Sequence, residues 1–239
     1  MAALLFASTD ESRYVLNGVL IEGHSAVSAK PTIVATDGRR LAVIETVADQ
    51  MPDDTLEDHS LLLKADFVKP LCALSKALGG KNSPWIQFSN NPGSNQMSVA
   101  FIGSKCFVEV EDGALIEGTF PDWRKIVPSK KAKREPINNL GLNAETVGDF
   151  AKAAKIMEAS TPIVQMNLVG KEQAIEVRLF SLPQFYGIIM PCKVDDSVEF
   201  QPEFLQVAKM FPEPEPEQGP QNAPPADKEE PPHITAGPQ

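Results

Sequence analysis

The residues whose types and spacing could support chemistry are few, and the most conspicuous are two adjacent arginines. Arg39 and Arg40 follow Asp37-Gly38 in the stretch VATDGRRLAV, where alternating apolar residues flank the Asp-Gly pair. Asp-Gly favours a tight turn, because glycine tolerates a positive φ and the aspartate side chain bonds its own backbone. The turn does not require an arginine after it. The pair therefore indicates either ordinary surface charge or a binding site.

No catalytic motif accompanies the arginines in the sequence. The 239 residues contain neither a Gly-x-Ser-x-Gly nucleophile turn nor a glycine-rich phosphate loop. The three histidines lie far apart, and Cys72, Cys106 and Cys192 lack metal-ligand spacing, so we interpret the cysteines as reduced thiols that mostly fill the core. Acid pairs such as Asp53-Asp54 and Asp195-Asp196 fall in expected loops. We therefore expect no enzyme activity, no metal and no cofactor.

The overall charge restricts the class of partner. Thirty-two acidic residues outweigh 22 basic ones, for a net charge of −10. An acidic protein does not coat DNA or an anionic membrane non-specifically, although a local basic face remains compatible with this balance. No apolar run reaches the length of a membrane helix, and the first residues lack the basic region of a signal peptide. We therefore expect a cytoplasmic protein without a membrane partner.

An internal repeat is the strongest signal of organisation. LLLKADFVKPLCALSKAL at 61–78 aligns with LGLNAETVGDFAKAAKIM at 140–157, each passing from an apolar strand into a helix. SPWIQFS at 83–89 then aligns with TPIVQMN at 161–167, and two more alternating runs follow each. The unit is β-α-β-β-β with a spacing of about 78 residues. The alternative is two similar amphipathic units that arose by chance.

Three strand-like runs, at 13–23, 31–38 and 39–48, precede the first unit. Each expected helix carries an apolar stripe, Phe67, Val68, Leu71, Leu74 and Leu78 in the first and Val147, Phe150, Ala151, Ala154 and Met157 in the second. A helix of this kind must cover one face of a mainly antiparallel sheet, so the predicted fold class is α+β.

Three segments in order resemble the family of bacterial DNA polymerase III beta sliding clamps. SRYVLNGVLIE at 12–22, with VATDGRRLAV at 34–43, is similar to the middle domain of that family. FPDWRKIVP at 120–128 is similar to the linker into the last domain, and GIIMPCKV at 187–194 to the C-terminal strand and tail. The resemblance covers about residues 4–195. It implies a sliding-clamp fold of βαβββ units, with antiparallel sheets, helices on one face and a channel for duplex DNA.

The resemblance also implies a domain organisation. Residues 1–119 correspond to the middle domain with its first strand and helix reduced, and 120–195 to the linker plus half of the last domain. Residues 196–239 are rich in proline and acid, which predicts a disordered tail. In the family, the first domain and the first half of the last domain close the ring, and neither has a counterpart in this sequence.

The family has an apolar pocket that binds short Gln-containing peptides of polymerases, clamp loaders and repair proteins. Matching positions imply a pocket wall made of Leu16 from the first strand, with Thr36, Gly38, Arg39, Arg40, Leu41, Pro121, Lys125, Ile126, Asn143, Ile188, Ile189, Met190, Pro191, Cys192, Lys193 and Val194. Methionine suits a site with several partners, because it repacks easily. The alternative is that Met190-Pro191 merely ends an edge strand.

Basic residues on the two helices and in the loop PSKKAKREP, at 128–136, are candidates for contact with DNA phosphates. They are Lys69, Lys76, Lys130, Lys131, Lys133, Arg134, Lys152 and Lys155. The alternative is that they are solvated surface charges. A second peptide-like segment, QPEFL at 201–205, has the form of a clamp-binding peptide that docks in its own pocket or a neighbour's. A short amphipathic helix over 202–211 is the alternative there.

The resemblance predicts a processivity factor of DNA replication, a non-catalytic subunit that tethers a polymerase to DNA. The implied partners are a replicative DNA polymerase, clamp-loader-type proteins, duplex DNA and a further copy of the chain. The alternative is a non-encircling module that recruits or sequesters clamp-binding proteins. Either function suits a protein of the bacterial cytoplasm, including one that a phage or plasmid encodes.

Overall fold

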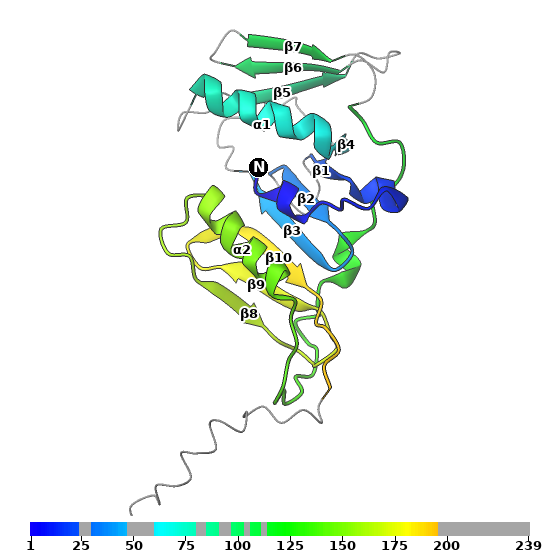
Figure 1. The fold of residues 1–239 in the computed structure, drawn as a ribbon, viewed down its shortest axis with the longest axis vertical. Helices are drawn as coiled ribbons and strands as arrows, with labels where there is room; N and C mark the ends of the chain where they lie inside the picture. The colour runs from blue at the N-terminus through cyan, green and yellow to red at the C-terminus, as the bar shows by residue number, and fades with distance from the viewer. Residues whose placement is uncertain are drawn as a thin grey trace, which may run out of the picture. The chain divides into compact units, whose positions relative to one another are not determined.

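Two antiparallel sheets carry the fold in the part of the chain that the computed structural model describes, residues 1–23, 30–46, 60–79, 85–90, 97–102, 106–110 and 114–195. The larger sheet has seven strands in the order β4-β1-β2-β3-β10-β9-β8 (Figure 1). These strands are β1 (Gly18–Glu22), β2 (Thr32–Thr36), β3 (Arg40–Glu45), β4 (Ser60–Lys64), β8 (Val164–Asn167), β9 (Ile175–Leu179) and β10 (Leu182–Ile189). The smaller sheet consists of β5 (Trp85–Asn90), β6 (Met97–Ile102) and β7 (Cys106–Val110).

Two α-helices and three short 3-10 helices complete the described elements. They are α1 (Ala65–Gly79), α2 (Ala144–Ile156), η1 (Ala3–Phe6), η2 (Glu11–Leu16) and η3 (Trp123–Ile126). The helix α2 begins where Asn143 caps it, since the Asn143 side chain accepts hydrogen bonds from the backbone N–H groups of Glu145 and Thr146. All these elements belong to the unit Met1–Val194. The predicted tail and the QPEFL segment lie outside the described residues.

The strands that precede the first repeat meet the second repeat in the larger sheet, because β3 pairs with β10. The pairing is antiparallel and sets Arg40 opposite Ile189 and Leu41 opposite Ile188. All strand pairs in both described sheets are antiparallel. This arrangement confirms the predicted α+β class.

The main core lies where α2 and η1 cover the larger sheet. Phe6, Phe150 and Phe185 are fully buried there, and the Phe6 and Phe150 rings pack edge to face with centroids 5.0 Å apart. A second apolar cluster joins Leu16, Leu41 and Ile188 to the linker residues Phe120 and Trp123. A third contains Leu63, Leu71 and Val99.

Five details of the sequence prediction were wrong. Leu16 belongs to η2 and not to a strand, because β1 begins only at Gly18. On α2 the residues three and four positions after Phe150 are buried, which are Ala153 and Ala154, whereas Ala151 is exposed.

Leu78 is also exposed, at the last turn of α1, and Cys192 is an exposed thiol instead of core filler. The expected strand at 140–142 is reduced to a single bridge between Gly141 and Cys192. The three histidines and Asp53-Asp54 lie outside the described residues.

Candidate partner-peptide surface

The turn between β2 and β3 is held by its own side chains. The Asp37 carboxylate accepts hydrogen bonds from the backbone N–H groups of Arg39 at 2.8 Å and Arg40 at 3.0 Å. Thr36 Oγ1 accepts from the Gly38 N–H at 3.0 Å and donates to the Arg40 carbonyl at 2.6 Å. Gly38 has a φ of 86°, which glycine adopts without strain. The predicted Asp-Gly turn is confirmed.

The Arg40 guanidinium hydrogen-bonds to three partners within the protein. It donates to Asp37 at 3.1 Å, to the Leu5 carbonyl at 2.9 Å and to Asp149, and it lies 5.4 Å from the centre of the Phe6 ring. The Arg40 and Asp149 side chains are both only 13% exposed. Arg40 therefore links β3 to α2 and to the N-terminal segment, while Arg39 is exposed.

The charge of Asp149 is stabilised by its neighbours. Burial by itself would raise the pKa of Asp149, but hydrogen bonds from Lys152 and Arg40 outweigh that effect and hold the pKa below its ordinary value. The carboxylate is thus ionised at neutral pH, as an ion pair with Arg40 requires.

The segment after β10 is fixed against the turn. The Met190 N–H donates to the Arg39 carbonyl at 2.8 Å, and the Cys192 N–H donates to the Gly141 carbonyl at 2.9 Å. From the other side, the Arg13 guanidinium of η2 donates to the Asp37 carbonyl at 3.2 Å. Three segments that are distant in the sequence therefore meet around the β2–β3 turn.

The predicted pocket residues divide into a buried floor and an exposed rim. The floor residues are Leu16, Thr36, Leu41 and Ile188, whereas Ile189 is buried in the main core with Phe150 and Phe185. The exposed ones are Gly38, Arg39, Pro121, Lys125, Ile126, Asn143, Met190, Cys192, Lys193 and Val194, while Arg40 and Pro191 are partly buried. Among the exposed residues Ile126, Met190 and Val194 are large and apolar, at 45%, 38% and 38% exposure. We call the floor and rim together the partner-peptide surface.

The linker helix η3 is anchored to the sheet by an interaction that the sequence analysis missed. Arg124 donates to both Glu22 oxygens at 3.0 Å, and the Trp123 indole N–H donates to the same carboxylate at 3.2 Å. Burial would raise the pKa of Glu22, but these hydrogen bonds from Arg124 and Trp123 lower it. The anchor positions Ile126 and Lys125, the two residues of η3 that belong to the partner-peptide surface.

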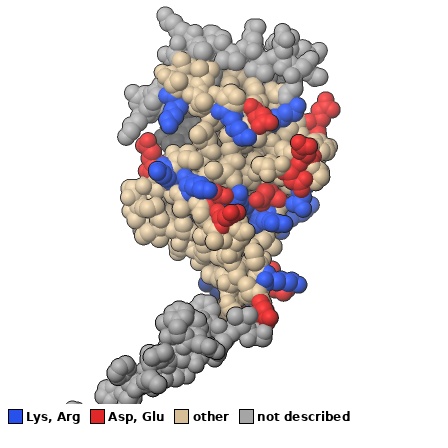
Figure 2. Space-filling model, in the orientation of Figure 1, with Lys and Arg blue, Asp and Glu red and all other residues tan. Residues whose placement is uncertain are grey.

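The candidate DNA-contacting residues are all exposed. Lys69 pairs with Asp66 at 3.1 Å and Lys152 with Asp149 at 2.6 Å, so two of these ammonium groups have acidic neighbours. Figure 2 shows Lys and Arg side chains next to Asp and Glu side chains on the face that it presents. The charges in this view are mixed instead of forming one basic stripe.

The described residues offer neither a metal site nor a membrane span. They contain no group of three or more His, Cys, Asp or Glu side chains arranged to hold a metal ion. None of their helices combines the length and apolar character needed to cross a bilayer.

The fold and the family model identify the class. Residues 2–122 match the model of the DNA polymerase III beta subunit, central domain. The chain belongs to this family, which confirms the resemblance drawn from the sequence.

Curated relatives and solved structures agree. The beta sliding clamp of Salmonella typhimurium strain LT2 is 34% identical over 144 residues, 59% of this chain and 33% of the relative. That of Escherichia coli strain K12 is 33% identical over 143 residues, again 59% of this chain and 33% of the relative. The chain thus spans about a third of the length of these relatives.

Solved clamps share the fold at lower identity. The DNA polymerase III beta subunit of Thermotoga maritima superimposes with a TM-score of 0.58 at 17% identity, covering 80% of this chain and 61% of that one. The sliding clamp of Bartonella birtlesii bound to griselimycin gives 0.58 at 19% identity, covering 81% and 63%. These likenesses confirm the sliding-clamp fold.

Proposed function

We propose that the chain acts as a sliding-clamp-type processivity factor, a non-catalytic subunit that tethers a DNA polymerase to DNA and binds short partner peptides. The observation that carries the proposal is the pairing of β3 with β10, which brings Leu41 beside Ile188 and the β2–β3 turn beside Met190. The division into a middle-domain-like part, 1–119, and half of a last domain, 120–195, is part of the same proposal.

The partner-peptide surface suits a short apolar peptide with a polar end. Ile126, Met190 and Val194 offer exposed apolar area, and the exposed Arg39 adds a guanidinium whose stem can cover peptide while its head meets polar atoms. A few apolar anchors at about 25 cal/mol per Å², less the cost of ordering the peptide, give an affinity of about −8 kcal/mol, or micromolar. Peptides of a polymerase and of clamp-loader-type proteins are the proposed ligands.

The test is the affinity of a fluorescent peptide of Gln-x-x-Leu-Phe form, measured by anisotropy. Met190→Ala should weaken binding about tenfold, because it removes an apolar anchor. Ile163→Ala is the matched control, since Ile163 is also an exposed apolar residue but does not belong to the partner-peptide surface. Equal loss in both variants, or no loss in Met190→Ala, would contradict the proposed surface.

Tethering to DNA requires a separate test. Encirclement demands a closed assembly of copies, whereas recruitment of clamp-binding proteins works with a monomer. Light scattering of the purified protein at micromolar concentration distinguishes the two. A strict monomer that still binds the peptide would rule out the ring and support the non-encircling module.

Contact with DNA phosphates has its own measurable signature. If the lysines of α1 and α2 face DNA, affinity should fall steeply with salt, and Lys155→Ala should reduce the slope of log K against log salt by about one. Lys125→Ala is the control, because Lys125 is exposed but is not one of the candidate DNA-contacting residues. A salt-insensitive complex would contradict phosphate contact.

A further inference from the structure

The two edges of the larger sheet differ in how their backbone groups are satisfied. At the β4 edge, the Lys64 N–H donates to the Ala114 carbonyl at 2.9 Å and the Ile116 N–H donates to the Leu62 carbonyl at 2.8 Å, so the segment 114–116 covers that edge. At the opposite edge β8 pairs with β9 on one side, and no described strand lies on its other side (Figure 1). Within the described part of the chain, the sheet is therefore covered at β4 and open at β8.

The backbone of β8 directs alternate residues toward the open edge. The Phe180 N–H, at the end of β9, donates to the Ile163 carbonyl at 3.0 Å. Antiparallel strands alternate between hydrogen-bonded and non-hydrogen-bonded positions, so Gln165, two positions along, also bonds to β9 in the continuous register of the two strands. Val164 and Met166 occupy the other positions. Their N–H and C=O groups therefore point away from β9, toward the open edge.

The residues of β8 do not protect this edge. Natural sheets guard an open edge with lysine, proline or a bulge, because unpaired N–H and C=O groups bind a further strand. The sequence of β8 is Val164, Gln165, Met166 and Asn167, which contains no charge and no proline, and its register with β9 is regular. Pro162 comes just before the strand and lacks an N–H, so it limits further pairing to about the length of β8. The edge thus suits a short added strand.

A second copy of β8 satisfies this edge completely. Antiparallel pairing about a two-fold axis sets Val164 of each chain opposite Met166 of the other, so that both residues exchange N–H···O bonds. Gln165 then lies opposite Gln165 of the second copy, and the two amides are complementary because an amide both donates and accepts hydrogen bonds. Like charges directly opposite one another would destabilise such a pair, and β8 brings none together.

We propose that two copies of the chain associate through their β8 edges and extend the larger sheet across a two-fold axis. The β4 edge is not an alternative partner, because the segment 114–116 already covers it. Pairing of β8 with β8 closes at two copies. The dimer carries two partner-peptide surfaces, since none of their residues lies in β8, and it binds a protein with two linked peptides more tightly than one copy does. This interface goes beyond the proposed function, which assigns no surface to contacts between copies.

The test is sedimentation equilibrium of the full chain at submillimolar concentration, because a short strand pair buries little surface and associates weakly. We expect a monomer–dimer equilibrium. Gln165→Lys should weaken dimerisation about tenfold or more, since it places two ammonium groups opposite each other at the axis. Asn138→Lys is the matched control, because it adds the same charge at an exposed position outside β8. A monomer throughout, undiminished dimerisation of Gln165→Lys, or a mass that rises beyond two chains would overturn the proposal.

A mixture of two variants locates the axis. Gln165→Lys and Gln165→Glu should each be mostly monomeric, whereas an equimolar mixture should dimerise again, because opposite charges then face each other. Gln165 is exposed, so neither variant disturbs the core, and the absence of recovery in the mixture would overturn the two-fold arrangement. Neither variant should change the affinity of the Gln-x-x-Leu-Phe peptide, and Met190→Ala should leave the dimer intact. These two measurements separate failure of the dimer from failure of the partner-peptide surface.

Discussion

Arg40 and Asp149 lie 109 residues apart in the sequence and form an ion pair that joins β3 to α2. Both side chains are only 13% exposed, and the same guanidinium also binds Asp37 and the Leu5 carbonyl. One arginine thus holds together the β2–β3 turn, the second repeat's helix and the N-terminal segment. Arg40 therefore has a structural role, whereas its neighbour Arg39 is exposed at the partner-peptide surface.

Replacement of Asp149 tests the strength of this link. Asp149→Asn keeps the shape but removes the charge that balances Arg40, so we expect the free energy of unfolding to fall by about 2–3 kcal/mol. Urea denaturation followed by circular dichroism measures the change. Lys152→Ala is the control, because Lys152 pairs with the same carboxylate from an exposed position and should cost less than about 1 kcal/mol. Similar losses of stability in both variants would contradict a larger contribution from the Arg40 pair than from the exposed Lys152 pair.

Lowering the pH should weaken the hydrogen bonds that anchor η3 to the sheet, because Glu22 becomes protonated. Its pKa in the folded protein lies below the ordinary value of 4.5, so the folded state binds fewer protons than the unfolded state near that pH. The stabilisation is present above pH 4.5 and is lost as the pH falls through the folded pKa. Urea midpoints between pH 6 and about pH 3 should therefore fall less in Glu22→Gln than in the unsubstituted protein. Parallel pH profiles for the two proteins would refute this role of Glu22.

Features encoded by neighbouring residues were predictable from the sequence. The Asp37-Gly38 turn, both α-helices and most strands follow from turn chemistry and periodicity, which act over a few residues. The error at Leu16 also had a local signal, because the Asp10 side chain accepts a hydrogen bond from the Ser12 N–H and so starts η2.

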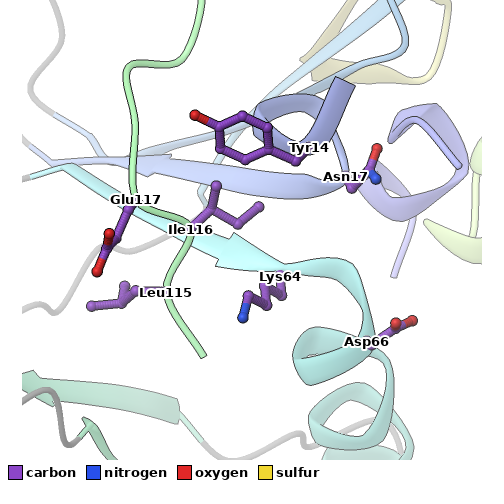
Figure 3. A pocket seen from close by; sticks show the side chains of 7 residues that line it. All are labelled: Tyr14, Asn17, Lys64, Asp66, Leu115, Ile116 and Glu117. Carbon is purple, nitrogen blue, oxygen red and sulfur yellow. The ribbon is translucent and has the colours of Figure 1, made fainter. Parts of the chain in front are cut away.

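Contacts between distant segments were not predictable in this way. The Arg40–Asp149 pair spans 109 residues, and Glu22 meets Arg124 across 102. Nothing in the local pattern around either arginine identifies its partner, because tertiary packing alone brings them together. A pocket lined by Tyr14, Lys64 and Leu115 was missed for the same reason, since its walls come from three separate segments (Figure 3).

Phe6 lies in an N-terminal segment for which the sequence pattern predicted no role, yet its side chain is part of the main core. Its ring is fully buried against Phe150 and Phe185, and it lies under the Arg40 guanidinium. Phe6→Ala should lower the free energy of unfolding by about 3–5 kcal/mol, because it removes a large buried side chain and leaves a cavity. Phe180→Ala is the matched control, since that ring is mostly exposed. A loss of under about 1 kcal/mol in Phe6→Ala would show that the N-terminal segment does not contribute to the core.

Substitutions of the two adjacent arginines should have different effects, one on peptide affinity and the other on stability. Arg39→Ala should weaken the Gln-x-x-Leu-Phe peptide about three- to tenfold with little change in the urea midpoint, because Arg39 is exposed beside Met190. Arg40→Ala should instead lower stability by about 3 kcal/mol, because it leaves Asp149 buried without its partner. Arg40→Lys restores the charge without the forked hydrogen bonds, and should recover only part of the stability. Peptide anisotropy and urea denaturation on the same three proteins measure both quantities. Loss of stability in Arg39→Ala, or full recovery in Arg40→Lys, would contradict the division of roles between the two side chains.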